Sequence, residues 1–259
     1  MAMATHDSGA RWKTFLSEAK EQEITLLLSR QTASPVIDVS FHELTGFDPE
    51  FAEDILISPR LIISSGHKIL SEICRDRGVD LDAMIRLSDL PKDTMRPLRE
   101  IGSRDIDKLR SLDVIVTKMS QLKPRIHLAV FQCETCGETQ QIDQTNESEL
   151  VEPIRCPPDT GCGASIRGTD STRFNLVMNI SRMINNQWLE IQELPENVPS
   201  GAQPSRAQVL LEGDLVNKHL PGQRITANVI PVVRSEIKKN KKTPMFDIIY
   251  HMVSSTHES

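Results

Sequence analysis

Four cysteines close together constrain this chain more than any other feature of its sequence. Cys133, Cys136, Cys156 and Cys162 have the spacing C-x2-C-x19-C-x5-C. Two thiolates separated by two residues straddle a tight turn, which Gly137 relieves, so both sulfurs can face one ion at about 2.3 Å. Pro and Gly residues between the second pair favour a turn that returns Cys162 to Cys156. The spacing predicts a closed, tetrahedral, all-thiolate site that suits structural zinc.

Three other interpretations of these cysteines stay open at this point: two disulfides, a redox dithiol and an iron–sulfur cluster. The start, Met1 to Arg11, lacks the basic stretch and apolar block of a secretory signal. We therefore expect a reducing compartment, where disulfides are rare. A redox dithiol would begin a helix in a βαβ unit, and no such pattern surrounds Cys133. Cys74 stands alone in an apolar helical stretch and is expected in a core.

The first part of the chain, to about Arg96, predicts mostly helices, and Pro91 and Pro97 then mark a boundary. Its apolar residues recur at helical spacing, with one short β-branched run between the helices. The signals are the stripe over Trp12–Leu28, the extended run Val36–Val39, the capping box of Ser40 with Glu43, the Asp48–Pro49 helix start, and a helix over Ser64–Cys74 that ends near Gly78.

From Ile101 the apolar period changes to two, which is typical of half-buried strands. Short strands separated by turns such as Pro221–Gly222 predict a small barrel or sandwich. The cysteine insert, about 132 to 168, interrupts this region. The alternating sets are Leu112, Val114 and Val116; Ile126, Leu128 and Val130; Phe174, Leu176 and Met178; Leu189 and Ile191; Val209 and Leu211; and Phe246, Ile248 and Tyr250.

A lysine-rich loop lies between two apolar runs near the end of the chain, a pattern that predicts a β-hairpin. Lys238, Lys239, Lys241 and Lys242 flank Asn240. From 231 to 250 the charge is five basic minus two acidic residues, or +3, in a chain whose net charge is −6. Phosphate binding gives a reason to concentrate like charges, because each lysine that neutralises a phosphate releases counterions. A solvated loop that lysines keep soluble is the alternative interpretation.

The remaining chemistry of the chain is sparse. Lys118, Lys123, Arg125, Arg173 and Arg182 are each expected to be ordinary surface charges, although together with the lysine loop they could line a groove. The chain lacks the motifs G-x-S-x-G, H-E-x-x-H and G-x-G-x-x-G and a phosphate loop with its lysine, so we expect no catalytic site within these residues. No apolar run approaches 18 residues, which predicts no membrane span.

Several stretches occur in an order that resembles one known family, the minichromosome maintenance (MCM) replicative helicases of the archaeal type. The resemblance is to the N-terminal portion of that family and covers nearly the whole chain. The stretches are VIDVSFHELTGFDPEFA (36–52), LREIGSRDIDKL (98–109), KPR followed by AVFQCETCG (123–137), WLEIQELPENVPSG (188–201), and GDLV followed by PGQRI (213–225). Asp107 and Asp113 depart from the family, which usually has glycines there, and the last two cysteines are more widely spaced than usual.

The resemblance implies an α+β, multi-subdomain fold. A helical bundle would occupy 1–96 and an OB-fold barrel 97–131 and 169–255. A zinc-ribbon module would be inserted at 132–168, and a basic hairpin would protrude at about 232–250. The parent would unwind duplex DNA at the replication fork, with ATP and Mg²⁺ in a motor module absent from this chain. We expect the chain to be an excised fragment that ends at Ser259, just after the last barrel strand.

The resemblance also implies partners. This portion would form a hexamer, and its zinc modules would help join two hexamers. Its other partners would be single- and double-stranded DNA and other replication-fork proteins, with no membrane, in a nucleoid-associated, cytoplasmic location. The hairpin lysines would hold phosphates, Lys123, Arg125 and Arg173 would be weaker single-strand contacts on the barrel, and the loop from Glu193 to Gln203 would communicate with the motor. The alternatives are a stand-alone, zinc-containing, single-strand-binding OB protein and a zinc-stapled interaction scaffold.

Overall fold

The computed structural model describes residues 2–30, 35–144, 149–167, 171–238 and 241–257. The chain forms two compact units. The first unit contains Met1–Gln121 and Gln187–Ser259, and the second contains Leu122–Asn186. The four predicted domain ranges stay predictions, and the second unit is longer at both ends than the predicted insert.

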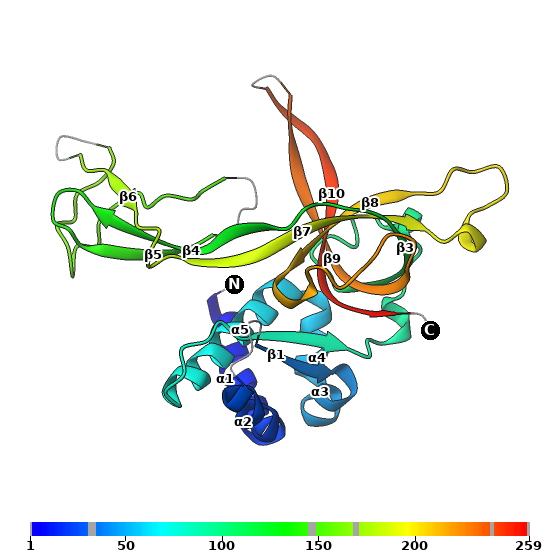
Figure 1. Ribbon diagram of the computed structural model, residues 1–259, viewed down its shortest axis with the longest axis horizontal. Coiled ribbons are helices and arrows are strands. Elements are labelled where there is room, and N and C mark those ends of the chain that lie inside the picture. The colour runs from blue at the N-terminus through cyan, green and yellow to red at the C-terminus, as the bar shows by residue number, and fades with distance from the viewer. Residues whose placement is uncertain (1, 31–34, 145–148, 168–170, 239–240, 258–259) are drawn as a thin grey trace. The chain divides into compact units, whose positions relative to one another are not determined.

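The first unit begins with five helices and a two-stranded parallel sheet (Figure 1). A single helical stripe is predicted from Trp12 to Leu28, but the structure has two helices that meet at Lys20. The Lys20 ammonium is drawn into the fold by Glu23 at 3.3 Å and Glu43 at 2.8 Å. The elements are α1 (Ala2–Ala19), α2 (Glu21–Arg30), β1 (Val36–Ser40), α3 (Phe41–Phe47), α4 (Pro49–Ile57), α5 (Pro59–Asp76) and β2 (Met84–Ser88).

Local sequence signals fix the starts of two of these helices. The predicted capping box is confirmed: the Ser40 hydroxyl caps the first turn of α3, and the Ser40 amide donates to the Glu43 carboxylate at 3.2 Å. Asp48 caps α4 by accepting from the Phe51 amide at 3.0 Å, with Pro49 in the first turn as predicted. These bonds satisfy amides that have no partner within the helix.

Strand β2 is not predicted by the sequence, because a charged residue interrupts its apolar pattern. Arg86 at its centre is nonetheless 6% exposed. Its guanidinium donates to Asp214 at 2.7 and 2.9 Å, to the Glu212 carbonyl at 2.8 Å and to the Val253 carbonyl at 3.2 Å. A distant carboxylate therefore accounts for the burial of this arginine.

The rest of the first unit is a closed barrel of five strands. Hydrogen bonds join them in the cyclic order β3–β9–β10–β8–β7–β3, with β8 and β10 parallel and closure by the β3–β7 pairing. Only the second part of β7 belongs to this unit. A five-stranded barrel of this kind is an OB fold, which confirms the fold that the resemblance implies. The strands are β3 (Arg110–Met119), β7 (Arg182–Glu193), β8 (Arg206–Glu212), β9 (Arg224–Lys238) and β10 (Lys241–His257), and the short 3₁₀ helices are Lys92–Thr94, Leu98–Glu100, Pro195–Asn197 and Gly213–Leu215.

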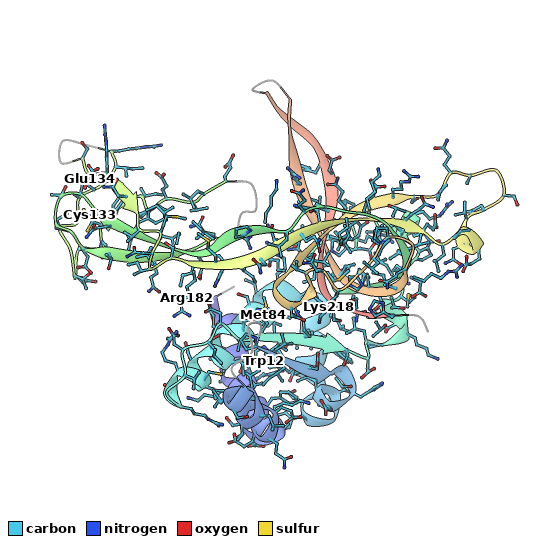
Figure 2. The ribbon with its side chains drawn as sticks, in the orientation of Figure 1. Trp12, Met84, Cys133, Glu134, Arg182 and Lys218 are labelled. Carbon is cyan, nitrogen blue, oxygen red and sulfur yellow. The ribbon has the colours of Figure 1, made fainter. Side chains whose placement is uncertain are left out.

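The long strands β9 and β10 belong to two hydrophobic cores at once. Val229 on β9 and Tyr250 on β10 face the barrel core, while Ile230 and Ile249 pack in the core of the helices. Successive side chains of a strand point to opposite faces, so one hairpin can serve both cores. Trp12 lies at the centre of the helical core (Figure 2), and Cys74 is fully buried there as predicted.

Asp107 stands where the resemblance implies a glycine, and its backbone has a conformation that favours glycine. Its φ is +57°, in the left-handed region that Asp tolerates better than most residues. Its amide donates to the Pro231 carbonyl at 2.9 Å. Asp113, the other departure, lies within β3 and accepts from the Thr226 hydroxyl at 2.6 Å. Both substitutions are therefore accommodated within the barrel.

The second unit is a ribbon that carries a loop-rich module (Figure 1). Its strand β4 (Lys123–Cys133) pairs with the first part of β7, with β5 (Thr139–Asp143) and with β6 (Phe174–Leu176). The alternation predicted to reach Met178 is wrong at its end. Strand β6 stops at Leu176, and Met178 is exposed in the turn that follows.

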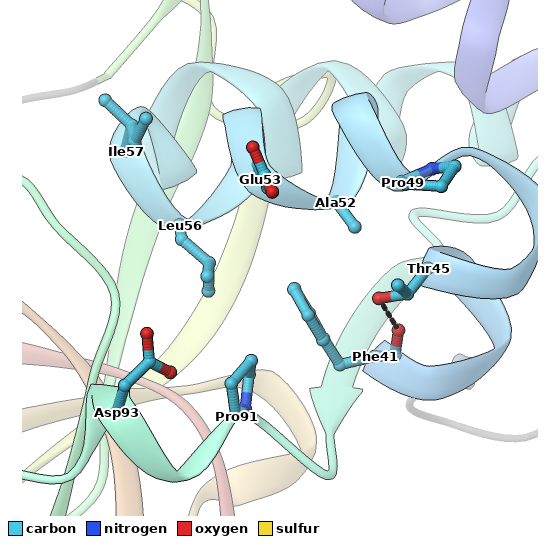
Figure 3. Close-up of a pocket in the computed structure, with 9 residues that line it drawn as sticks. All are labelled: Phe41, Thr45, Pro49, Ala52, Glu53, Leu56, Ile57, Pro91 and Asp93. Atoms are coloured by element: carbon cyan, nitrogen blue, oxygen red, sulfur yellow. Dashed lines mark hydrogen bonds between the residues drawn. The ribbon is translucent and has the colours of Figure 1, made fainter.

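A cavity of about 370 Å³ lies among α3, α4 and the segment after β2 (Figure 3). Its walls include Phe41 and Leu56, and its polar groups include the carboxylates of Glu53 and Asp93 and the Thr45 hydroxyl. That hydroxyl donates to the Phe41 carbonyl at 2.7 Å.

Among the described residues, no helix is both long enough and apolar enough to cross a membrane.

Candidate metal centre and nucleic-acid interface

The first cysteine pair lies on the turn that follows strand β4. Cys133 is the last residue of the strand, and its carbonyl accepts from the Gly137 amide at 2.9 Å. Gly137 has φ of +77°, a conformation that favours glycine, as the predicted turn requires. The turn directs Cys133 and Cys136 toward one point of the module, where Figure 2 labels Cys133.

The second pair is brought together by a tight turn despite its wider spacing. The Gly161 amide donates to the Pro157 carbonyl at 2.9 Å, and the Cys156 amide donates to the Ala164 carbonyl at 2.8 Å. A Cβ atom at Gly161 would collide with the sulfur of Cys156. Glycine at this position therefore lets the backbone approach the sulfur closely.

All four predicted cysteines meet in the second unit. Their sulfur atoms lie within 4.8 Å of one another, and no other such group of metal-ligating residues occurs in the described ranges. Cys133 and Cys162 are 3.7 Å apart and Cys136 and Cys156 3.6 Å apart, measured between sulfurs. A tetrahedral site with bonds of about 2.3 Å has edges of about 3.8 Å. These separations fit one shared ion and are far longer than a disulfide bond of about 2.05 Å.

The surroundings of the cysteines shift the pKa values of Cys133 and Cys156 in opposite directions. A hydrogen bond with the Thr172 hydroxyl, helped by backbone amides, lowers the pKa of Cys133 to about 6. Burial raises the pKa of Cys156 to about 12, because a thiolate without solvent is unfavourable there. Four thiolates this close together repel one another, so a positive ion is needed for all four to ionise. The cluster therefore has the chemistry of a cation site.

Thr172 is a candidate site residue that the sequence analysis does not single out. Its hydroxyl oxygen lies 3.2 Å from the Cys133 sulfur and accepts from the Thr135 hydroxyl at 2.8 Å. Thr172 is 39 residues from Cys133 along the chain, and no periodic pattern connects the two residues. The one available signal is its position two residues before Phe174, which pairs with Cys133.

The predicted basic hairpin is formed by β9 and β10. Beyond Pro231 the described pairing of β9 is with β10 alone, so the two strands continue past the barrel as a ribbon (Figure 1). The backbone of Lys238 pairs with that of Lys241, and Lys242 pairs with Ile237. Three of the four lysines thus lie at the last described positions of the hairpin; of these three the structure describes the backbone, and Lys239 lies outside the described residues. Their contact with phosphates stays a prediction.

The three basic residues expected to make weaker DNA contacts on the barrel lie elsewhere. Lys123, Arg125 and Arg173 lie in the second unit, not on the closed barrel. Lys123 and Arg125 share one face of β4, and the Arg125 guanidinium donates to the Gln144 carbonyl at 3.0 Å. Arg173 lies next to Phe174, which pairs with Cys133 at the far end of β4 from Lys123. The ten steps from Lys123 to Cys133 span about 33 Å, at about 3.3 Å per residue. Arg173 therefore does not form one cluster with Lys123 and Arg125, because most of the length of β4 lies between them.

Taken together, these features define an OB-fold protein with a basic hairpin and an inserted four-cysteine module. Residues 97–234, which are 138 of the 259 residues, match the family model described as the MCM OB domain. The chain belongs to the MCM family. This confirms the resemblance found in the sequence.

Named relatives and a solved structure agree with this assignment. The chain is 28% identical over 252 residues to the minichromosome maintenance protein MCM of Saccharolobus solfataricus, which covers 92% of this chain and 34% of that protein. It is 25% identical over 204 residues to the DNA replication licensing factor mcm4-A of Xenopus laevis, covering 78% of this chain and 22% of the relative. The crystal structure of the N-terminal domain of an archaeal MCM matches with a TM-score of 0.84 and 26% identity, over 98% of this chain and all of the other.

The chain corresponds to only part of these longer relatives. The chain spans about a third of the archaeal relative and about a fifth of the frog relative. The match to a solved N-terminal domain indicates which part of such proteins it resembles.

Proposed function

We propose that this chain is the DNA-binding and ring-forming collar of an ATP-dependent replicative helicase. Its membership of the MCM family and its likeness to an archaeal N-terminal domain support this function. ATP and Mg²⁺ would act in a motor module outside this chain, which would unwind duplex DNA at the replication fork. The collar would bind single- and double-stranded DNA, assemble as a hexamer and work with other fork proteins in the nucleoid.

The observation that carries the DNA-binding proposal is the lysine-bearing hairpin. The two strands extend past the barrel and end in a chain segment with four lysines. Lys238 and Lys241 are directly opposite in the pairing, where like charges destabilise a hairpin. An anionic partner removes this repulsion, and the phosphates of DNA are such a partner. Lys123, Arg125 and Arg173 would add weaker contacts to single strands.

The four-cysteine cluster is proposed to hold structural zinc. The residues fit the ion, because two pairs of sulfurs are separated by about the edge of a tetrahedral site and all four lie within 4.8 Å of one another. Cys133, Cys136, Cys156 and Cys162 would be the ligands. Bound there, zinc would neutralise the thiolates and cross-link the loops of the module. A site closed by four protein ligands leaves no position for a substrate, so its role would be to hold the fold.

An exposed apolar surface on the same module supports a role in assembly. Ile154 is 69% exposed and Ile166 is 41% exposed, and the Ile166 amide donates to the Ile154 carbonyl at 3.0 Å. Contiguous exposed apolar side chains mark surfaces that other proteins cover, and these two isoleucines would contribute to such a surface. We propose that a second copy of this chain covers it where two hexamers meet.

Salt titration tests the DNA-binding proposal. Replacing Lys238 and Lys241 together with alanine should weaken duplex binding and reduce the slope of log K against log salt. The expected reduction is about 1.8 for each chain bound, at about 0.9 for each phosphate that is no longer neutralised. Binding isotherms over a range of salt concentrations measure it.

A matched control removes the same charge elsewhere. Lys13 and Lys92 are exposed in the helical part of the first unit, and their double alanine variant should keep the wild-type slope. An unchanged slope and affinity in the hairpin variant would contradict the proposal and favour the zinc-stapled scaffold. Strong binding to single strands by a strict monomer would instead favour the stand-alone OB protein.

A further inference from the structure

Two threonine hydroxyls form a chain that ends at one sulfur of the cysteine cluster. The Thr135 hydroxyl donates to the Thr172 oxygen at 2.8 Å, and that oxygen lies 3.2 Å from the Cys133 sulfur. Thr172 and Cys133 are 5% and 1% exposed, so water does not compete freely for either group. The sulfur of Cys133 thus has a fixed polar neighbour in a nearly dry environment.

The proton of Thr172 has two acceptors within reach. One is the Cys133 sulfur and the other is the Arg173 carbonyl at 3.3 Å. A metal-bound thiolate is an acceptor without a proton of its own, and hydrogen bonds to ionised acceptors are stronger than those to neutral ones. The bond received from Thr135 polarises the Thr172 hydroxyl further toward the sulfur. The thiolate is therefore the favoured acceptor.

Backbone hydrogen bonds on both sides of Thr172 hold it in this position. The Thr172 amide donates to the Ser165 carbonyl at 2.9 Å, and the next carbonyl, of Arg173, accepts from the Glu134 amide at 3.0 Å. Phe174 then pairs with Cys133 between β6 and β4. In the folded module these bonds fix the backbone of Thr172 and so place its hydroxyl beside the sulfur.

We propose that Thr135 and Thr172 are outer-sphere positioning residues, which stabilise Cys133 as a metal-bound thiolate through a two-hydroxyl relay. This inference rests on the proposed zinc site. Hydrogen bonds to metal ligands orient them and tune the metal, and their removal typically lowers metal affinity by about 10- to 100-fold. Cys133 would be the ligand whose charge the protein supports most strongly from the side chains around it.

The test measures zinc affinity of the whole chain by competition with a chelator. Thr172→Val keeps the shape of the side chain and removes its hydroxyl, and it should lower zinc affinity by about 10- to 100-fold. Thr172→Ser should retain near wild-type affinity. Thr135→Val should have a smaller effect, and adding it to Thr172→Val should cause no further loss, because the relay is already broken.

Two controls distinguish the relay from general damage to the module. Thr139→Val makes the same change at an exposed threonine of the same unit and should leave the affinity unchanged. In the cobalt-substituted protein, Thr172→Val should move the sulfur-to-cobalt charge-transfer absorption to lower energy. The shift is expected because a thiolate without its hydrogen bond is more electron-rich, and a merely structural role would not move the band.

The outcomes separate this inference from the proposal beneath it. A wild-type chain that binds no zinc would overturn both. A chain with one zinc, whose affinity and cobalt spectrum are unchanged by Thr172→Val, would overturn the relay and leave the zinc site standing. Loss of affinity without a spectral shift would also overturn it, because that result describes a destabilised module.

Discussion

Replacing Cys156 with serine is expected to remove zinc from the second unit and to unfold its loops, while the first unit stays folded. Cys156 is fully buried at the cluster, and a serine hydroxyl is not ionised at neutral pH, so it is a poor ligand. Neither of the two described hydrophobic core clusters contains a residue of the second unit. The unit buries a few apolar side chains of its own, such as Phe131. We expect zinc binding, whose free energy is about 10–16 kcal/mol in small zinc peptides, to supply much of the folding free energy of this unit.

Metal analysis and limited proteolysis measure this effect together. The wild-type chain should hold one zinc, and Cys156→Ser should hold none and be cleaved within 122–186. Cys74→Ala is the matched control, because Cys74 is also fully buried but lies in the helical core. The Cys74→Ala variant should have a less stable first unit and should still hold one zinc in the second unit. Full zinc content in Cys156→Ser would refute the ligand assignment, and an iron–sulfur absorption in the wild type would identify a different cofactor.

The second large effect is expected at the buried ion pair between β2 and the barrel. Arg86→Met should lower the free energy of unfolding of the first unit by about 3 kcal/mol, the low end for breaking a buried pair. The substitution leaves Asp214 buried and removes the donor to the carbonyls of Glu212 and Val253. Lys218 still pairs with Asp214 at 2.7 Å, which limits the loss. Denaturant unfolding measures the difference.

The loss of stability in Arg86→Met should depend on pH, because the ion pair contains the Asp214 carboxylate. Burial alone would raise the pKa of Asp214, but Arg86 and Lys218 outweigh burial and lower it. A carboxylate with a lowered pKa stabilises the fold above its unfolded-state pKa of about 3.9, and this stabilisation is lost as the pH falls through the folded-state value. The difference between wild type and Arg86→Met should therefore shrink below about pH 4.

An exposed partner of the same carboxylate supplies the control. The Lys218 side chain is 51% exposed, so Lys218→Met should cost less than about 1 kcal/mol. Equal losses from the two variants would mean that the burial of Arg86 contributes nothing special. No loss from Arg86→Met would show that the apolar side chain packs as well as the ion pair does.

The features that the sequence predicts are those with local or periodic signals. The capping box at Ser40, the alternation of Leu112, Val114 and Val116, and the four-cysteine spacing all depend on residues a few positions apart, and the structure contains each of them. The hairpin is also predicted, because two apolar runs flank its turn. Local pattern therefore accounts for most of the barrel and for the metal-type cluster.

The features that the sequence misses depend on distant partners. Arg86 looks like a surface residue until Asp214, 128 positions away, is known to face it, so β2 could not be predicted. The helical stripe over Trp12–Leu28 does not reveal that two helices meet at Lys20, whose ammonium binds Glu43 in another helix. Thr172 reaches Cys133 only once β6 has paired with β4. Such contacts form only when distant parts of the chain have folded together, and a pattern of neighbouring residues cannot predict them.

Photo-crosslinking from the hairpin tests the central claim most directly. A benzophenone side chain is placed at Lys241 in one variant and at the exposed helical Lys13 in another, and each is irradiated with labelled DNA. If the hairpin of this MCM barrel holds DNA, the probe at 241 should form a covalent adduct that disappears at high salt, and the probe at 13 should not. Adducts of equal yield at both positions, or none at 241 under conditions where the chain binds DNA, would contradict it.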